Sequence, residues 1–437
     1  MPVCHFCTLG CSCTIARASP STQMWARLGV PETQIRALRR LARGIFIAYD
    51  IMTTMLNPSE HPHRRWNPLL RSYVICSPHR TQRPWQGAQE RVSGNDLPAY
   101  DSSCYLCPGN TRATGATNEA YTSTFIFEND FAALKDIEVE SQGSQNSTDV
   151  VEADLFRMEP SRGKCYVLCF HPNHNLTLAH LTTLPYSAEE HILPIVRAWS
   201  DMYLRIPKEN PFVKYIQFFE NKGSAMGCSN PHPHGQIWAL DHIPCEPLTE
   251  LESMRAFALD TKHSNAQGPR DPWGRPSLLL EYVHLELKKE GRPRIVCMNN
   301  DFVALVPFWA VWPFEIMVLP YKRFIASVAV LNESEALNLA HILGEVACRF
   351  DNLFQTSFPY SMGLHQRPIP AKSEPTGEDL SDFAVLHIHF YPPLLRSATV
   401  RKFLVGFEMM AEPQRDITAE SAAERLRACP TTHYLSS

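Results

Sequence analysis

The stretch Ser229-Asn230-Pro231-His232-Pro233-His234-Gly235-Gln236-Ile237-Trp238 decides how the rest of this chain is interpreted. In an extended strand, side chains two residues apart project from one face, so both imidazoles and the Gln236 amide share a side. The two prolines lack a backbone N–H and block a helix, which predicts an edge position beside a site. A His-x-His pair alone fits a structural or metal-binding pair as well as a reactive one.

The segment before this stretch, residues 222–229, is small and contains glycine. A backbone of this composition can approach a phosphate closely and offer its amides to it. An imidazole that stands beside neutral amide donors and such a loop is suited to attack a phosphoryl group. Phosphoryl chemistry is therefore our first expectation for this strand.

Composition narrows the class of protein. The 437 residues suffice for two to three domains or one duplicated unit, and the hydrophobic and charged fractions are those of a globular protein. The net charge of −4 shows no basic surplus, so we expect neither nucleic acid nor a membrane as partner. Fourteen cysteines without a secretory signal indicate a reducing compartment, and we expect a cytoplasmic protein.

Residues 1–58 differ from the remainder of the chain. They hold six arginines but only Glu32 and Asp50 as acids. This composition fits a transit peptide or an upstream extension, and we expect it to be disordered or weakly helical.

An internal repeat defines the expected fold. Asn129-Asp130-Phe131 returns as Asn300-Asp301-Phe302, and each copy is followed by strands, a helix and a His-x-His strand. The expected helices cover residues 187–204 and 334–351, and the expected strands include residues 72–76, 165–170 and 215–219. We predict an α+β fold in which a duplicated unit forms a mostly antiparallel sheet flanked by helices, with halves at 59–255 and 256–437.

A second motif, Cys104-Tyr105-Leu106-Cys107, is a knuckle that lets two thiolates converge on one cation. Two further ligands are needed. By chemistry alone, either histidine of His171-Pro172-Asn173-His174 would serve as one of them.

These motifs together resemble the galactose-1-phosphate uridylyltransferase family, the transferase branch of the histidine triad superfamily. The resemblance begins near His61 and reaches the C-terminus. It is carried, besides the His-Pro-His-Gly-Gln stretch, by residues 61–65, 77–80, 83–90, 129–131, 358–363 and 391–403.

The resemblance implies two metal centres. Cys104, Cys107, His174 and His232 match the family's structural zinc ligands, which leaves His234 as the nucleophile. Glu250, His365, His387 and His389 match a second site for Fe²⁺ or Zn²⁺, with Glu252 as the alternative acid. The chain departs from the family at Leu364, Gln366 and Arg367 around this second site.

The resemblance also implies the substrates, UDP-glucose and galactose 1-phosphate, and a ping-pong reaction of the Leloir pathway through a uridylyl-histidine. Gln236 would hold a phosphoryl oxygen, and a homodimer would complete each site across its interface. The implied substrate contacts are Arg80, Arg83, Phe127, Asn129, Asp130, Asn221, Gly227, Cys228, Ser229, Lys402, Phe403, Val405, Gly406, Phe407, Glu408 and Gln414, where Phe407 replaces a tyrosine.

Two other functions compete with this expectation. One is a sibling nucleotidyl transferase such as a dinucleoside polyphosphate phosphorylase, which also carries a His-x-His-x-Gln strand. The other is a non-catalytic protein that binds sugar nucleotides, which would bind UDP-glucose without forming a covalent adduct.

Overall fold

The structure is a computed structural model that describes residues 56–82, 97–138, 151, 155–369 and 377–436. Residues 58–437 belong to one compact unit, to which everything below refers. The expectations for residues 1–58, and for Arg83, lie almost wholly outside the described residues. Among the described helices, none is long and apolar enough to cross a membrane.

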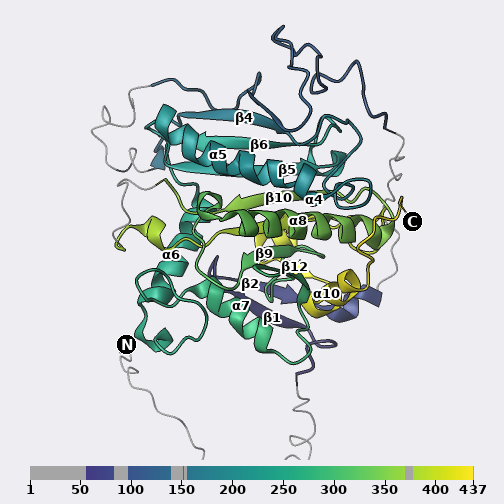
Figure 1. The fold of residues 1–437 in the computed structure, drawn as a ribbon. Coiled ribbons are helices and arrows are strands. Elements are labelled where there is room, and N and C mark those ends of the chain that lie inside the picture. The colour runs from purple at the N-terminus through teal and green to yellow at the C-terminus, as the bar shows by residue number, and fades with distance from the viewer. Residues whose placement is uncertain (1–55, 83–96, 139–150, 152–154, 370–376, 437) are drawn as a thin grey trace, which may run out of the picture. The chain divides into compact units, whose positions relative to one another are not determined.

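A nine-stranded antiparallel sheet forms the centre of the unit (Figure 1). Its strands, in spatial order, are β3 (Phe125–Glu128), β4 (Gly163–Cys169), β6 (His234–Leu240), β5 (Tyr215–Lys222), β10 (Tyr360–His365), β11 (His387–Tyr391), β9 (Ile316–Pro320), β8 (Phe302–Leu305) and β7 (Ile295–Met298). The order β3-β4-β6-β5 returns in mirrored sequence as β10-β11-β9-β8 on the other side of the β5–β10 pair. This arrangement confirms the predicted duplication and fold class.

The two halves share this one sheet and are not separated by a linker. The proposed division at residue 255 stays a prediction, and it falls inside the helix α6 (Cys245–Leu259).

Two long helices cover one face of the sheet. They are α5 (Leu193–Glu209), preceded by the short α4 (Ala188–His191), and α8 (Glu333–Phe354), and they pack on alternate buried strand residues in the main core (Figure 1). The predicted helix start at residue 187 is confirmed, since Ser187 is the N-cap of α4 and its side chain accepts the Glu190 N–H. For α8 the cap is Asn332, two residues before the predicted start, in a capping box with Glu335.

The opposite face carries the chemistry-bearing residues. Helices α6 and α7 (Leu278–Lys288) pack on it near β7, β8 and β9 in a second core. The Cys-x2-Cys knuckle packs on it at β4, where Leu106 and Cys107 belong to one cluster of buried side chains with Val167 and Cys169. These two layers leave the middle of the face, at β6 and β5, between them.

A smaller sheet joins residues far apart in sequence. Strand β12 (Gln414–Arg415) from the second half adds to β2 (Ser72–Cys76), which pairs with β1 (His63–Asn67). The remaining elements are α9 (Phe407–Met410), α10 (Ala419–Arg427) and the 3₁₀ turns η1 (Pro78–Gln82), η2 (Ser224–Met226), η3 (Thr261–His263), η4 (Val328–Val330) and η5 (Leu380–Phe383).

The predicted edge position of the His-Pro-His strand is wrong. Strand β6 lies between β4 and β5 and is hydrogen-bonded on both sides. It begins at His234, after both prolines, so no ladder N–H is lost inside it. The prolines shape the approach to the strand and not the strand itself.

Candidate active site

His234 is the first residue of β6, and its protonation state follows from its contacts. Its Nδ1 lies 2.7 Å from the carbonyl oxygen of His232, which can only accept, so Nδ1 carries the proton. The lone pair is therefore on Nε2. Burial lowers the pKa of His234, although the same carbonyl opposes that shift, so the ring is neutral at physiological pH. A neutral imidazole with a bare Nε2 is a nucleophile.

Gln236 shares the face of β6 with His234, as the sequence predicts, because the two side chains alternate with Gly235. The Trp238 indole donates to the Gln236 Oε1 at 3.1 Å, so the amide presents its Nε2 hydrogens as donors. Gly235 itself has no room for a side chain, because a Cβ there would lie 2.9 Å from a ring carbon of Phe170. Because neighbouring segments of the backbone approach so closely, the position between His234 and Gln236 requires glycine.

The loop before β6 turns through two glycines in the left-handed region, Gly223 and Gly227, with φ of 84° and 78°. This conformation favours glycine and directs short stretches of backbone amides toward one place. Ser229 is exposed and Cys228 half-buried, so both are accessible to a ligand. The loop forms one wall of a cavity of about 420 Å³, whose lining also includes His174 and Pro231 but not His234.

The four side chains predicted for the first metal centre lie close together. The ligand atoms of Cys104, Cys107, His174 and His232 lie within 4.8 Å of one another, and all four residues are buried. Burial raises the pKa of the Cys107 thiol to about 11, so a thiolate there needs a cation nearby. Of the two candidate histidines, the structure selects His174, whose Nδ1 lies 3.6 Å from the Cys107 sulfur.

His171, the rejected alternative, supports the centre through its backbone. Its carbonyl oxygen lies 2.9 Å from His232 Nε2, which therefore carries the proton and leaves Nδ1 to face the Cys107 sulfur at 3.5 Å. The Tyr121 hydroxyl, 3.0 Å from the same Nε2, is a second acceptor. Sequence reasoning missed Tyr121, since only the fold brings it to the knuckle. This tautomer fits a metal ligand.

The second cluster is also assembled, from three elements. His365 on β10 pairs across the ladder with His387 on β11, and Glu250 on α6 reaches all three histidines, with His365 Nδ1 2.6 Å from its Oε2. His387 Nδ1 lies 2.8 Å from the Val385 carbonyl, so its Nε2 is bare. That nitrogen and both of His389 are buried without a hydrogen-bond partner. Buried imidazole nitrogens without a hydrogen-bond partner, gathered beside a carboxylate, fit a metal ion.

The acid of this cluster is settled by burial. Glu250 is 3% exposed, whereas Glu252 pairs with Arg71 at the surface. The departures from the family pattern lie off the cluster: Leu364 faces the helix-covered core, and Gln366 accepts the Val328 N–H. Neither of these two side chains belongs to the group of four that could hold a metal ion.

One row of paired residues connects β6 with the second cluster. Gln236 pairs with Phe219, Phe219 with Gly363, and Gly363 with His389 across four neighbouring strands. Residues paired in this way share a face of the sheet. The side chains of His234 and Gln236 and the second cluster therefore lie on one side of the sheet, and Asn221, which accepts the Ser361 hydroxyl at 2.7 Å, lies there as well.

The candidate nucleoside contacts gather at the β3 edge. Phe127 is half-buried on β3, and Asn129 caps the Phe131 N–H at 2.9 Å. Asp130 receives Arg112 Nη1 at 3.0 Å, and the Arg112 guanidinium lies 4.2 Å from the centre of the Phe127 ring. Arg112 was missed from the sequence, because no motif marks it and only the fold places it on this ring.

The remaining candidates do not gather at His234 in the single chain. Arg80 in η1 and Gln414 in β12 both contact Asp416, on the small sheet. Lys402 and Glu408 form an ion pair. Between them, a turn at Gly406 exposes an apolar surface made by Phe403, Val405 and Phe407.

The fold and site together define a duplicated protein of the histidine-triad type, with one His-x-His segment in each half. Models of the N- and C-terminal domains of galactose-1-phosphate uridyl transferase match residues 53–244 and 259–437. The chain belongs to the galactose-1-phosphate uridylyltransferase family, a family of nucleotidyltransferases.

Individual relatives agree with this assignment. The Kluyveromyces lactis galactose-1-phosphate uridylyltransferase is 47% identical over 382 residues, which cover 86% of this chain and 96% of that protein. The Haemophilus influenzae protein of the same name is 45% identical over 383 residues, covering 88% and 99%. A solved uridylyltransferase superposes with a TM-score of 0.60 at 26% identity, covering 84% of this chain and 98% of its own. An Arabidopsis thaliana ADP-glucose phosphorylase shares the fold, with a TM-score of 0.59 at 19% identity and coverage of 85% and 100%.

Proposed function

We propose that the chain transfers a uridylyl group from UDP-glucose to galactose 1-phosphate through His234, in the galactose branch of carbohydrate metabolism. The observation that carries this proposal is the tautomer of His234, whose Nδ1 proton is held by the His232 carbonyl. The Nε2 lone pair attacks the α-phosphorus, a P–N bond forms, and the bond to the glucose 1-phosphate oxygen breaks. A phosphate oxygen of galactose 1-phosphate then attacks the same phosphorus and releases Nε2, giving UDP-galactose.

The residues around His234 have separate tasks in this reaction. Gln236 donates to a phosphoryl oxygen, and the amides of the loop at Gly227, Cys228 and Ser229 hold the diphosphate. Such preorganised donors stabilise charge where it develops. A glutamine amide cannot protonate the leaving group or activate water, which favours a covalent intermediate that waits for the second sugar phosphate.

Binding of the nucleoside falls to the β3 edge. The Phe127 ring offers a stacking face for uracil and Asp130 an acceptor for ribose hydroxyls, with Asn129 and Asn221 nearby in the same half of the sheet. Arg80 and Arg83 supply positive charge for the phosphates. Arg112 pairs with Asp130 and lies against the face of the Phe127 ring.

The two clusters would each hold a metal ion. We propose Zn²⁺ at Cys104, Cys107, His174 and His232, where it would brace the segment that leads into His234. Fe²⁺ or Zn²⁺ would occupy Glu250, His365, His387 and His389 and tie α6 to strands β10 and β11 of the sheet. When bound, these ions supply structural rigidity, and the phosphoryl chemistry stays with His234 and its donors.

We further propose a cytoplasmic homodimer. The hexose-binding segment, Lys402 to Glu408 with Gln414 behind it, exposes Phe403, Val405 and Phe407 in the single chain, as a segment that completes a neighbouring subunit's site would. The ten cysteines of the described residues are all free thiols, which agrees with a reducing compartment.

Intact-mass spectrometry after mixing the protein with UDP-glucose alone tests the proposal. We expect a gain of one uridylyl group that is labile in acid, absent in His234→Gly and discharged by galactose 1-phosphate. His242→Gly, an exposed histidine in the turn after β6, is the control and should label normally. Binding of UDP-glucose without an adduct would contradict the proposal and favour a sensor, whereas labelling by ADP-glucose in preference would favour a sibling transferase.

A further inference from the structure

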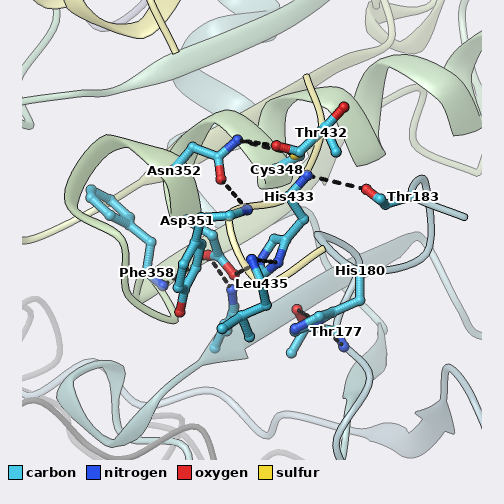
Figure 2. Close-up of polar contacts among 12 residues, drawn as sticks. Thr177, His180, Thr183, Cys348, Asp351, Asn352, Phe358, Thr432, His433 and Leu435 are labelled. Atoms are coloured by element: carbon cyan, nitrogen blue, oxygen red, sulfur yellow. Dashed lines mark hydrogen bonds and ion pairs between the residues drawn. The ribbon is translucent and has the colours of Figure 1, made fainter. Parts of the chain in front are cut away.

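The C-terminal segment of the chain, residues 429–436, is fastened to the last turns of α8 (Figure 2). Asn352 donates to the carbonyls of Pro430 and Thr432 and accepts the Tyr434 N–H, at 2.8 to 2.9 Å. The Cys348 thiol donates to the Thr431 carbonyl. These bonds insert one side chain of the segment, His433, into the interior, where none of it is exposed.

His433 reaches a buried carboxylate. Its Nε2 lies 3.3 Å from Asp351 Oδ2, and the other oxygen of Asp351 receives Lys222 Nζ at 2.7 Å. The Leu435 N–H points at His433 Nδ1, so the imidazole proton is on Nε2 and is donated to Asp351. Burial opposes ionisation of Asp351, but Lys222 and these donors lower its pKa. The junction is thus one ion pair completed by a neutral histidine.

Three walls of the cavity beside the glycine loop meet at this junction. Lys222 is the last residue of β5, directly before the loop, and a Cβ on Gly223 would lie 3.1 Å from Pro359. Asp351 Oδ1 also accepts the Phe358 N–H at 2.8 Å, which holds the neighbouring wall around Pro359. The third wall contains His180.

His180 connects that third wall to the tail. Its ring centre lies 4.3 Å from that of His433, and its Nδ1 accepts the Thr177 N–H at 3.2 Å. Thr177, His180 and Lys222 all line the cavity. Figure 2 shows His433 between the α8 side chains and the segment that carries Thr177 and His180.

We propose that His433 and Asp351 are positioning residues that set the shape of the substrate cavity by holding Lys222 at the base of the glycine loop. The inference rests on the proposed function, because it assigns the loop to the diphosphate of UDP-glucose. Neither residue is among those that line the cavity. They act through Lys222 and through the Phe358 amide.

The physical reason is the cost of an incomplete buried ion pair. Without a donor from His433, Asp351 Oδ2 is a buried anionic oxygen without its partner, and Asp351 and Lys222 must shift to find another. The Lys222 peptide moves with its side chain, and the loop amides that follow lose their geometry. A displacement of about 1 Å at binding groups costs up to about a hundredfold in rate or affinity.

The test compares three variants in the full-length, metal-loaded protein. His433→Phe keeps a ring in the site but removes the donor. His433→Gln restores an N–H near the Nε2 position. Arg349→Met is the matched control, because Arg349 Nη1 anchors the carbonyls of Leu426, Arg427 and Cys429 without touching Asp351 or His433.

The readouts are the rate constant and the apparent Kd for UDP-glucose in single-turnover labelling of His234, with the thermal midpoint measured alongside. We expect His433→Phe to raise the apparent Kd by about tenfold or more and His433→Gln to return it to within about threefold of the natural protein. Arg349→Met should lower the thermal midpoint and leave the Kd within about twofold. His433→Asn, whose amide stops short of Asp351, is a second variant that should repeat the Kd increase if the phenylalanine protein does not fold.

Equal Kd values in the His433 variants and in Arg349→Met would overturn the inference and leave the tail a purely structural clamp. That result is distinct from failure of the proposed function, in which the natural protein itself would form no adduct with UDP-glucose.

Discussion

A buried ionic junction at Glu420 supports a quantitative prediction. Glu420, at the start of α10, receives Arg65 from β1 through two bonds of 3.0 and 2.9 Å, and Arg294 at 2.6 Å. The Arg65 side chain is only 2% exposed and 32% of Glu420 is exposed. The junction therefore holds the small sheet, which continues into the turn of Arg80, against α10.

The magnitude follows from the pKa. Burial by itself raises the pKa of Glu420, but the bonds and charge of Arg65, with Arg294 adding to them, lower it from 4.5 to about 2. At about 1.4 kcal/mol per pKa unit, this difference corresponds to about 3 kcal/mol of folding free energy. Because a third of the side chain faces solvent, screening reduces this to about 2 kcal/mol.

The variant Glu420→Gln should therefore lower the free energy of unfolding by about 2 kcal/mol at pH 7, or the thermal midpoint by about 2–3 °C for a unit of this size. A carboxylate with a lowered pKa stabilises fully above its unfolded pKa and loses that contribution as the pH falls toward 2. The difference between the two proteins should thus be about a quarter smaller at pH 4 than at pH 7. Urea titrations followed by tryptophan fluorescence at both pH values measure it.

Glu412→Gln is the matched control, because Glu412 is about as exposed as Glu420 but pairs with Arg64, a neighbour of Arg65 on β1 whose side chain is 52% exposed. An exposed pair contributes about 0–1 kcal/mol, so this variant should change little. Equal effects of the two substitutions, or a difference that grows on acidification, would refute the reasoning about the buried junction.

Three further outcomes are expected. Tyr121→Phe removes the hydroxyl beside the knuckle histidine and should weaken zinc binding by about tenfold to a hundredfold in a chelator competition; unchanged affinity would contradict its role. Arg112→Met should raise the apparent Kd for UDP-glucose by about tenfold in the labelling reaction, whereas an unchanged Kd would mean that its contact with Phe127 is only structural. Glu250→Gln should lose the second metal in elemental analysis, while Glu252→Gln keeps it; the reverse result would reassign the acid.

Much of the site was predictable because its residues are close in sequence. The alternation of a strand places His234 and Gln236 on one face, and the Cys104–Cys107 spacing brings two thiols to one point whatever the surrounding fold. The repeat of Asn-Asp-Phe predicted the duplication, which the mirrored strand order confirms. The position of α8 was predicted to within a few residues, since the helix expected at 334–351 is capped by Asn332 and ends at Phe354.

The misplaced edge strand has a specific cause. Prolines are excluded from the hydrogen-bonded interior of a sheet, but this rule applies only to residues within the ladder. Where a strand begins depends on its partners, and β6 starts at His234 because that residue is the first to pair with β4, at Cys169. A local pattern cannot show where the partner strand ends.

By itself, the sequence determined the shared face of His234 and Gln236, the Cys-x2-Cys knuckle and the presence of two repeated halves, since each depends on spacing within a few residues or on a repeated motif. Only the tertiary structure chose His174 over His171 and Glu250 over Glu252, because ligand choice depends on which side chain reaches a common point. The same holds for Lys222, Asp351 and His433, which are separated by 129 and 82 residues and meet only in the folded chain. A buried charge requires a partner, and the partner's position along the chain is set by packing alone.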